Sequence, residues 1–285
     1  MGADCCGGLV ANATDPTRTL TLRKRFQREF GRRFRWLRGE VRREIDEYDG
    51  FGLRTNRFVF ERSDAKVAAF MEWLEGKVHE GVLDVRIGTP MRAAASQWWG
   101  NVYLSSAYQR GISQAASQMR GAGAQVDQRW VDAAFQRDIH ADRAGLAFIR
   151  AYEELEGVTD AMSQQISRHL AEGLATGQHP RDIAKNINDR VNRVGLSRAR
   201  VLAQTEVIAA HAEAQLNTFT EARIEGVQVI AEHSTAGDDR VCEICEPMEG
   251  QTYSIEEARG KIPVHPNCRC TFRPIIENGR DIELR

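Results

Sequence analysis

The sequence lacks three features that would each have fixed its class: a long apolar run, a clear excess of one charge, and an even spread of cysteine. No stretch approaches the roughly 18 consecutive apolar residues of a transmembrane helix, so we predict no contact with a membrane. Lysine and arginine (39) nearly balance aspartate and glutamate (40), and the formal net charge is −1. The chain as a whole is therefore not an electrostatic nucleic-acid binder, and any such role must be local.

Cysteine is absent between Cys6 and Cys242, which excludes a disulfide scaffold that would staple the whole chain. The N-terminus has neither the basic nor the apolar region of a secretory signal. Its Met-Gly start with Cys5 and Cys6 suggests acylation, but no Ser or Thr stands at the sixth position. We interpret residues 1–21 as a flexible tail. The other four cysteines are gathered near the C-terminus, which is typical of a metal site.

Apolar residues are present with helical spacing along most of the chain. Steps of four, four, three, four and four residues join Phe26, Phe30, Phe34, Leu37, Val41 and Ile45. In the second half, steps of four join Met162, Ile166, Leu170 and Leu174. Such steps place the residues on one face of a helix. A further long helix is predicted from Ser197 to about Glu225.

These patterns predict a mainly α fold of the α+β kind. Residues 22–156 form a helical N-terminal region, and residues 157–285 form a helical second half. The second half ends in a small loop- and β-rich Cys/His module at residues 234–276, of the kind that binds zinc. Gly157 and Gly195 are expected to end helices, and Thr159 and Ser197 to cap the helices that follow.

The first predicted helix carries a dense basic stripe, with ten Lys or Arg against three Glu between Leu22 and Glu44. The stripe either contacts DNA or an acidic protein surface, or is a solvated face, since no base-reading motif lies beside it. Because the apolar stripe on the opposite face needs a partner, we predict an interaction element outside the folding core. The predicted partner-binding residues are Arg28, Phe30, Arg32, Phe34, Arg35 and Arg42.

The C-terminal module contains two short groups of metal-ligating residues. A C-x2-C pair, Cys242 and Cys245, is followed some twenty residues later by His265, Cys268 and Cys270. Zinc takes four such ligands at tetrahedral corners, and two short ligand groups joined by a loop can supply them. The first choice is Cys242, Cys245 and Cys268 with either His265 or Cys270, and the fifth residue would support the site. The alternative is a small core of reduced or partly paired cysteines.

Three other functions compete with a closed, structural zinc site. His211 and Glu213 followed by Cys242-x-x-Cys245 match part of the zinc deaminase pattern, but Val241 stands where that pattern has Pro. A zinc-bearing nuclease would need a further His/Asp/Asn metal site, which we do not find. A cellular DNA-binding zinc protein would need basic residues around the cysteines, where the segment is net acidic. The sequence also has no phosphate loop, nucleophile elbow or Ser/His/Asp arrangement.

Five motif blocks in the last hundred residues carry a resemblance to a known family. They are Gly177-x-x-Pro180-Arg-Asp-Ile-Ala, Arg198-Ala-Arg-Val-Leu-Ala-Gln-Thr205-Glu206, Thr235-Ala-Gly-Asp-Asp239-Arg240-Val-Cys242-x-x-Cys245, Gly250, and His265-Pro-Asn-Cys268-Arg-Cys270. In order and spacing they resemble the phage Mu F-like domain of the head-morphogenesis family, which includes the minor head protein of phage SPP1. The sequence departs from the family at His211, where Asn is frequent, and at His233, where an aromatic residue is common.

The resemblance implies a minor capsid protein of a tailed phage without enzymatic activity. Its expected place is the virion, in the capsid interior near the portal, after a period in the host cytoplasm during assembly. The expected partners are the portal protein, with the major capsid or scaffolding protein and packaged DNA (bound without sequence preference) as further candidates. We expect Thr205, Glu206, Asp239 and Arg240 to be structural, either orienting a ligand of a Zn²⁺ ion or pinning the module to the long helix.

Overall fold

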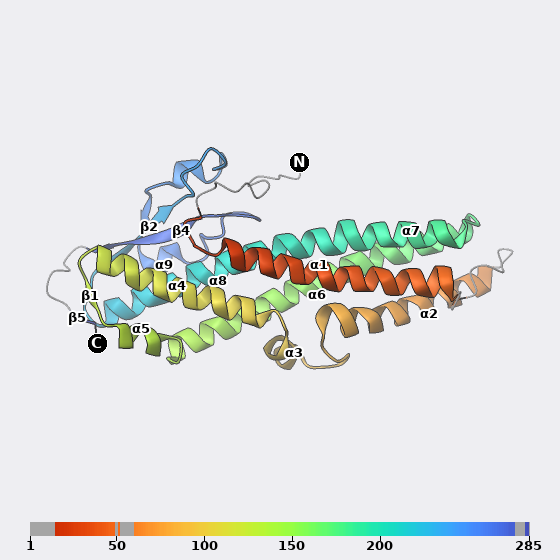
Figure 1. Cartoon of the computed structure of the whole chain (residues 1–285), viewed down its shortest axis with the longest axis horizontal. Helices are drawn as coiled ribbons and strands as arrows, with labels where there is room; N and C mark the ends of the chain where they lie inside the picture. The colour runs from red at the N-terminus through yellow and green to blue at the C-terminus, as the bar shows by residue number, and fades with distance from the viewer. Residues whose placement is uncertain (1–14, 49–50, 52–59, 277–282, 285) are drawn as a thin grey trace. The chain divides into compact units, whose positions relative to one another are not determined.

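The computed structural model describes residues 15–48, 51, 60–276 and 283–284. The fold is mainly α with a small antiparallel sheet near the C-terminus, as the sequence predicted (Figure 1). The predicted tail lies outside the described residues as far as residue 14. Within the described part of the chain, no helix combines the length and apolar character needed to cross a membrane.

Helices account for most of the described residues. They are α1 (Leu20–Arg42) with the π-helical turn η1 (Arg43–Glu47), α2 (Phe60–Val78) with η2 (His79–Leu83), α3 (Met91–Gln97), α4 (Asn101–Gly121), α5 (Gln128–Ala134), α6 (Asp138–Ala175), α7 (Pro180–Arg190) with η3 (Val191–Leu196), α8 (Ser197–Ile224), the 3₁₀ turn η4 (Glu246–Met248) and α9 (Ile255–Ala258). Pro180 is the first residue of α7, a position where its missing N–H costs nothing.

The strands form two small sheets. β2 (Val229–Ser234) is the central strand of an antiparallel sheet, between β3 (Thr252–Tyr253) and β4 (Thr271–Ile276). Ser234 is paired with Thr271, so β4 begins directly after Cys270. The short strands β1 (Gln125–Val126) and β5 (Glu283–Leu284) are paired in parallel.

The described residues divide into two compact units, each built from separate stretches of the chain. We call residues 1–25, 100–148 and 203–285 the sheet unit, and residues 26–99 and 149–202 the helical unit. Helices α1, α6 and α8 contribute residues to both units. The boundaries of these two units differ from the predicted boundary between residues 156 and 157. The predicted division into two domains stays a prediction.

The apolar stripe of α1 lies in the core of the helical unit. Its six members, Phe26, Phe30, Phe34, Leu37, Val41 and Ile45, are all fully buried. The Phe30 ring is 4.9 Å from that of Phe26 and 5.0 Å from that of Trp99. The prediction that this helix lies outside the folding core, with Phe30 and Phe34 free for a partner, is wrong. The rest of the chain covers the stripe, and each buried Phe stabilises the fold by roughly 1.5–3 kcal/mol.

Two predicted helix breaks are also wrong. α6 continues without interruption through Gly157, and the Thr159 hydroxyl donates to the Glu156 carbonyl instead of capping a new helix. The helical backbone also continues through Gly195 into α8. A Cβ at Gly195 would lie 2.4 Å from Phe34 Cε1. This glycine therefore allows close packing of η3 on α1.

In the sheet unit, α4 and α8 approach each other at a second glycine. A Cβ at Gly111 would lie 2.4 Å from the backbone oxygen of His211 and 2.7 Å from the Cβ of Ala214. Both partner atoms belong to a buried part of α8 and cannot swing away as the end of a side chain can. The absence of a side chain at position 111 therefore sets the distance between the two helices.

We expect Gly111→Ala to lower the free energy of unfolding by about 1–3 kcal/mol, since a methyl group must push α4 and α8 apart. Gly145→Ala in α6 is the matched control, because a Cβ there meets nothing within 4 Å. That change should raise stability by about 0.5–1 kcal/mol through the helix propensity of Ala. Urea unfolding of both variants measures the difference, and equal effects would contradict the close contact.

The start of α1 is held by the side chain of Asp15. One carboxylate oxygen accepts the backbone N–H of Leu20 at 2.6 Å, and the other accepts a guanidinium N–H of Arg23 at 2.8 Å. Arg23 is only 2% exposed. Burial lowers the pKa of Arg23, while Asp15 acts in the opposite direction. The first turn of α1 is therefore anchored by a buried ion pair in the sheet unit.

Candidate metal centre

The C-x2-C segment folds into a tight turn. The backbone N–H groups of Cys245 and Glu246 both donate to the Cys242 carbonyl, at 3.0 and 2.9 Å. Pro247 follows in the 3₁₀ turn η4, where its fixed φ suits the first positions. The turn brings both sulfur atoms to the same side of the backbone, as a metal knuckle requires.

The second group of ligand residues forms another turn, which is attached to α8. The Cys268 N–H donates to the His265 carbonyl at 3.1 Å, and Asn267 has a φ of +65°, which Asn tolerates better than most residues. The Asn267 carbonyl accepts from the Gln204 side chain at 3.0 Å, and its N–H donates to the Thr205 hydroxyl at 3.4 Å. Thr205 thus contacts the turn, in the arrangement proposed for it from the sequence.

All five predicted ligand residues come together in the sheet unit. The donor atoms of Cys242, Cys245 and His265 lie within 4.8 Å of one another, and so do those of Cys245, Cys268 and Cys270. Cys245 is the member common to both groups. None of the four cysteines forms a disulfide. The cluster therefore offers soft and borderline donors in sufficient number for one metal ion.

The hydrogen bonds of His265 show which ring nitrogen faces the cysteines. Its Nδ1 lies 2.8 Å from the Pro266 carbonyl, which can only accept, so Nδ1 carries the proton. In a neutral ring, the lone pair of Nε2 then points at the sulfur atoms of Cys242 and Cys245, 3.2 and 3.1 Å away. A backbone carbonyl that fixes the far nitrogen is the usual support of a metal-binding histidine.

The three buried thiols, Cys245, Cys268 and Cys270, interact with one another. Hydrogen bonds from Cys245 and Cys270 stabilise a thiolate on Cys268 and hold the pKa of Cys268 below its ordinary value. The same interactions raise the pKa of Cys245. The backbone N–H of Cys270 also lies 3.5 Å from the Cys268 sulfur. A bound divalent cation would stabilise thiolates on several of these residues.

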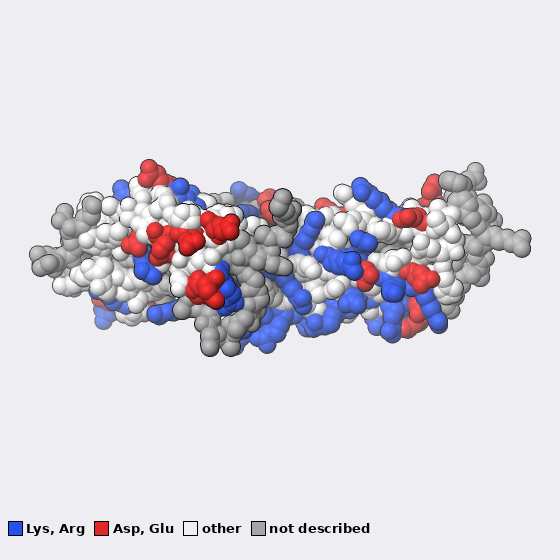
Figure 2. Space-filling model, turned by 90° about the horizontal axis from the view of Figure 1, so that it is seen from above, with Lys and Arg blue, Asp and Glu red and all other residues white. Residues whose placement is uncertain are grey.

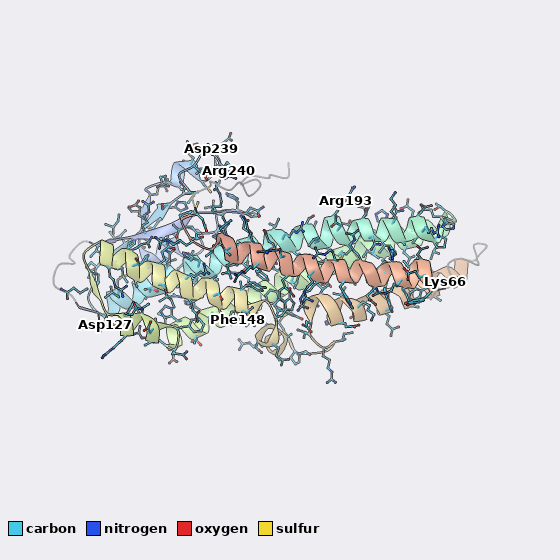
Figure 3. All side chains as sticks on the ribbon, viewed as in Figure 1. Lys66, Asp127, Phe148, Arg193, Asp239 and Arg240 are labelled. Carbon is cyan, nitrogen blue, oxygen red and sulfur yellow. The ribbon has the colours of Figure 1, made fainter. Side chains whose placement is uncertain are left out.

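Asp239, Arg240 and Glu206, which the sequence predicted to support the site, lie in different surroundings. Asp239 is exposed, and Figure 3 shows Asp239 and Arg240 at the outer edge of the module. Glu206 is buried in α8. The carboxylate that holds the module is instead Asp238, whose two oxygens each accept from Arg269 at 2.7 Å. Asp238 is the neighbour of the predicted Asp239, and the sequence alone does not show which of the two carboxylates faces Arg269.

The sequence also failed to identify the residues that hold the module on α8. The fully buried Gln215 donates to the Phe272 carbonyl at 2.9 Å and accepts from the Phe272 N–H at 3.2 Å, which fastens β4. Arg259 donates to Glu213 at 2.6 Å and to Asn217 at 3.0 Å. Polar residues inside an otherwise apolar helix were the only available indication of these contacts.

The deaminase interpretation receives no support from the position of its residues. His211 is fully buried beneath α4, where burial lowers its pKa to about 4 and Gln114 lies 3.2 Å from its Nε2. Glu213 is paired with Arg259. Within the described residues, the groups that could hold a metal do not include His211. Packing of α4 on α8 accounts for this histidine.

The comparisons with known proteins agree with the motif blocks. Residues 164–273 match the family described as Phage Mu protein F like protein. The matched segment begins in α6, includes α7, α8, β2, β3 and all five clustered Cys and His residues, and ends within β4. Searches among curated proteins and among solved structures find no match for this chain.

Proposed function

We propose that the protein is a minor head component of a tailed phage that acts in head morphogenesis, because residues 164–273 match the family described as Phage Mu protein F like protein. The family match is the observation that carries this proposal. The role is structural rather than enzymatic, since the cluster brings together five Cys and His side chains, enough to fill all four coordination positions of a zinc ion. A catalytic zinc site would instead keep one coordination position open to substrate.

The metal that fits the donor set is Zn²⁺. Thiolate sulfur and imidazole nitrogen are its preferred ligands, and a structural site uses four of them. The proposed ligands are Cys242, Cys245 and His265, completed by Cys268, the thiol whose anion receives hydrogen bonds. Cys270 then supports the site by donating its backbone N–H to the Cys268 sulfur.

In this proposal the zinc module stiffens the end of α8. Three contacts attach the module to α8. The turn between His265 and Cys268 is hydrogen-bonded to Thr205, Arg259 is paired with Glu213, and β4 is hydrogen-bonded to Gln215. Three attachments along one helix keep the module in a fixed orientation, as a protein that docks on a large assembly requires. The proposed place of action is the capsid interior beside the portal, with the portal protein as main partner and the shell or scaffolding protein as further ones.

Assembly of heads from the proteins of the same phage tests this function. We expect the protein to cosediment with procapsids and to copurify with portal oligomers. The control is assembly without the portal protein, where incorporation should fall several-fold if the portal recruits it. A protein that stays soluble and unassociated in both assemblies would contradict the proposal. Incorporation that does not depend on the portal would place the contact on the shell or scaffolding protein.

A further inference from the structure

The exposed face of α1 consists almost entirely of arginine. Six residues of this helix are exposed, namely Thr21, Arg25, Arg28, Arg32, Arg35 and Arg42. They are separated by three, four or seven residues and therefore lie along one side of the helix. The acidic residues of α1, Glu29 and Glu40, are half-buried: Glu29 pairs with Arg32 of the exposed row and with Arg33, and Glu40 pairs with Arg43.

A second group of arginines lies beside this face in the helical unit. The segment from Val191 to Leu202 has three exposed arginines, Arg193, Arg198 and Arg200, and no acidic residue. It runs antiparallel to α1, because Gly195 packs on Phe34 and the Arg200 carbonyl accepts from Gln27 at 3.2 Å. Arg193 points outward in Figure 3.

The two groups meet at Gly31. The position that a Cβ of Gly31 would take is 3.2 Å from Arg35 Nη1 and 3.6 Å from Arg200 Nη2. Two guanidinium groups, one from each helix, therefore flank the same point of the surface. In Figure 2, Lys and Arg side chains crowd the middle and right of the view, where α1 and the start of α8 lie. We define the arginine face as Arg28, Arg32, Arg35, Arg42, Arg193, Arg198 and Arg200.

A partner of the arginine face has to bind guanidinium groups and meets no large exposed apolar side chain there. The centre of a protein interface is normally apolar or aromatic and poor in charge. The three phenylalanines of α1 are buried in the core and Trp36 is half-buried, and no large exposed apolar side chain lies on α1 or in the described segment 191–202. A polyanion with regularly spaced charges fits such a surface better than a folded acidic protein does.

We propose that the arginine face binds the phosphate backbone of double-stranded DNA without sequence preference. Arg28 to Arg42 spans about 21 Å of helix. Duplex DNA carries one negative charge per roughly 1.7 Å of its axis, so phosphates are available along the whole row. Guanidinium groups bind phosphate oxygens through paired N–H donors. The inference rests on the proposed function in one respect, since DNA packaged in the head is the duplex that the protein would meet.

The experiment compares two triple variants of the full-length protein. Arg28→Gln, Arg35→Gln and Arg198→Gln remove three charges from the arginine face. Arg86→Gln, Arg92→Gln and Arg168→Gln remove three charges from exposed positions elsewhere in the helical unit. Surface changes of this kind usually alter stability by less than about 0.5 kcal/mol, and thermal unfolding of both variants verifies this.

Fluorescence anisotropy with a random-sequence duplex, between about 50 and 200 mM salt, gives the readout. For the face variant we expect weaker binding to every sequence, and a fall of about three in the slope of log affinity against log salt, one per arginine. The control variant should keep the wild-type slope. Equal losses in both variants, or wild-type protein that binds polyglutamate as tightly as DNA, would overturn the proposal.

A parallel assembly assay separates this inference from the proposed function. The face variant should enter particles as the wild type does, because its expected defect is in DNA binding alone. Loss of incorporation with DNA binding unchanged would identify an acidic protein as the occupant and overturn the DNA proposal. Wild-type protein that binds DNA through this face but never enters particles would contradict the head function and leave the inference standing.

Discussion

Cys268→Ser is expected to abolish metal binding and to unfold the Cys/His module. The wild-type protein should contain about one zinc per chain. In small zinc domains metal binding supplies roughly 10–16 kcal/mol, which is folding free energy for a module with little core of its own. Elemental analysis of the purified variant measures the loss of zinc. Thermal unfolding with and without a chelator should show that wild type with chelator behaves like the variant.

Cys270→Ser is the matched control for this prediction. It removes a buried thiol two residues away but leaves the four proposed ligands and the Cys270 N–H in place. It should therefore retain zinc, with only a modest loss of stability. A zinc-free Cys270→Ser with a zinc-loaded Cys268→Ser would assign the fourth position to Cys270. Wild-type protein without metal, whose four clustered thiols all react freely, would refute the metal centre itself.

Asp15→Ala should destabilise the sheet unit by about 3–5 kcal/mol, because it leaves the buried Arg23 guanidinium without its carboxylate. The variant also loses the acceptor for the Leu20 N–H at the start of α1. Urea unfolding followed by circular dichroism measures the change. Asp46→Ala is the control, since it breaks an exposed Asp–Arg pair with Arg181 that is worth at most about 1 kcal/mol.

A double variant tests whether the buried charge is the cause. Asp15→Ala combined with Arg23→Met removes the carboxylate and the guanidinium together and keeps an apolar side chain of similar length. It should recover most of the stability that Asp15→Ala loses, because no unpaired charge stays in the interior. A double variant as unstable as Asp15→Ala would show that the cap on Leu20, and not the ion pair, holds this segment.

Helical periodicity predicted the helices well but not what covers them. Phe26 to Ile45 repeat at helical steps, and α1 with η1 spans these residues. The sequence could not show that Trp99 and Gly195 close over the stripe, since they are far away in the chain. Local propensity favours a break at glycine and predicts helix ends at Gly157 and Gly195. Gly195 instead packs closely on Phe34, and α6 continues through Gly157, where a Cβ would meet nothing within 4 Å.

The Cys/His cluster was predictable because its residues come in short groups. The spacing of Cys242 and Cys245, and of His265, Cys268 and Cys270, is a local property that the sequence displays directly. The choice of four proposed metal ligands among these five residues, in contrast, is not a local property of the sequence. It depends on the Pro266 carbonyl behind the His265 ring and on the N–H that Cys270 donates to Cys268. The choice between Asp238 and Asp239 likewise depended on where Arg269 lies.

The sequence by itself determined the helical class, the match of residues 164–273 to a known family and the short groups of Cys and His, because periodicity, motif order and residue spacing are all read along the chain. Only the tertiary structure decided which face of α1 is available. Burial of its apolar side chains in the core, where they avoid water, leaves most of its arginines outside, since a guanidinium is costly to desolvate; the buried Arg23 is paired with Asp15. The same helix that the sequence predicted to offer phenylalanines to a partner therefore presents arginines.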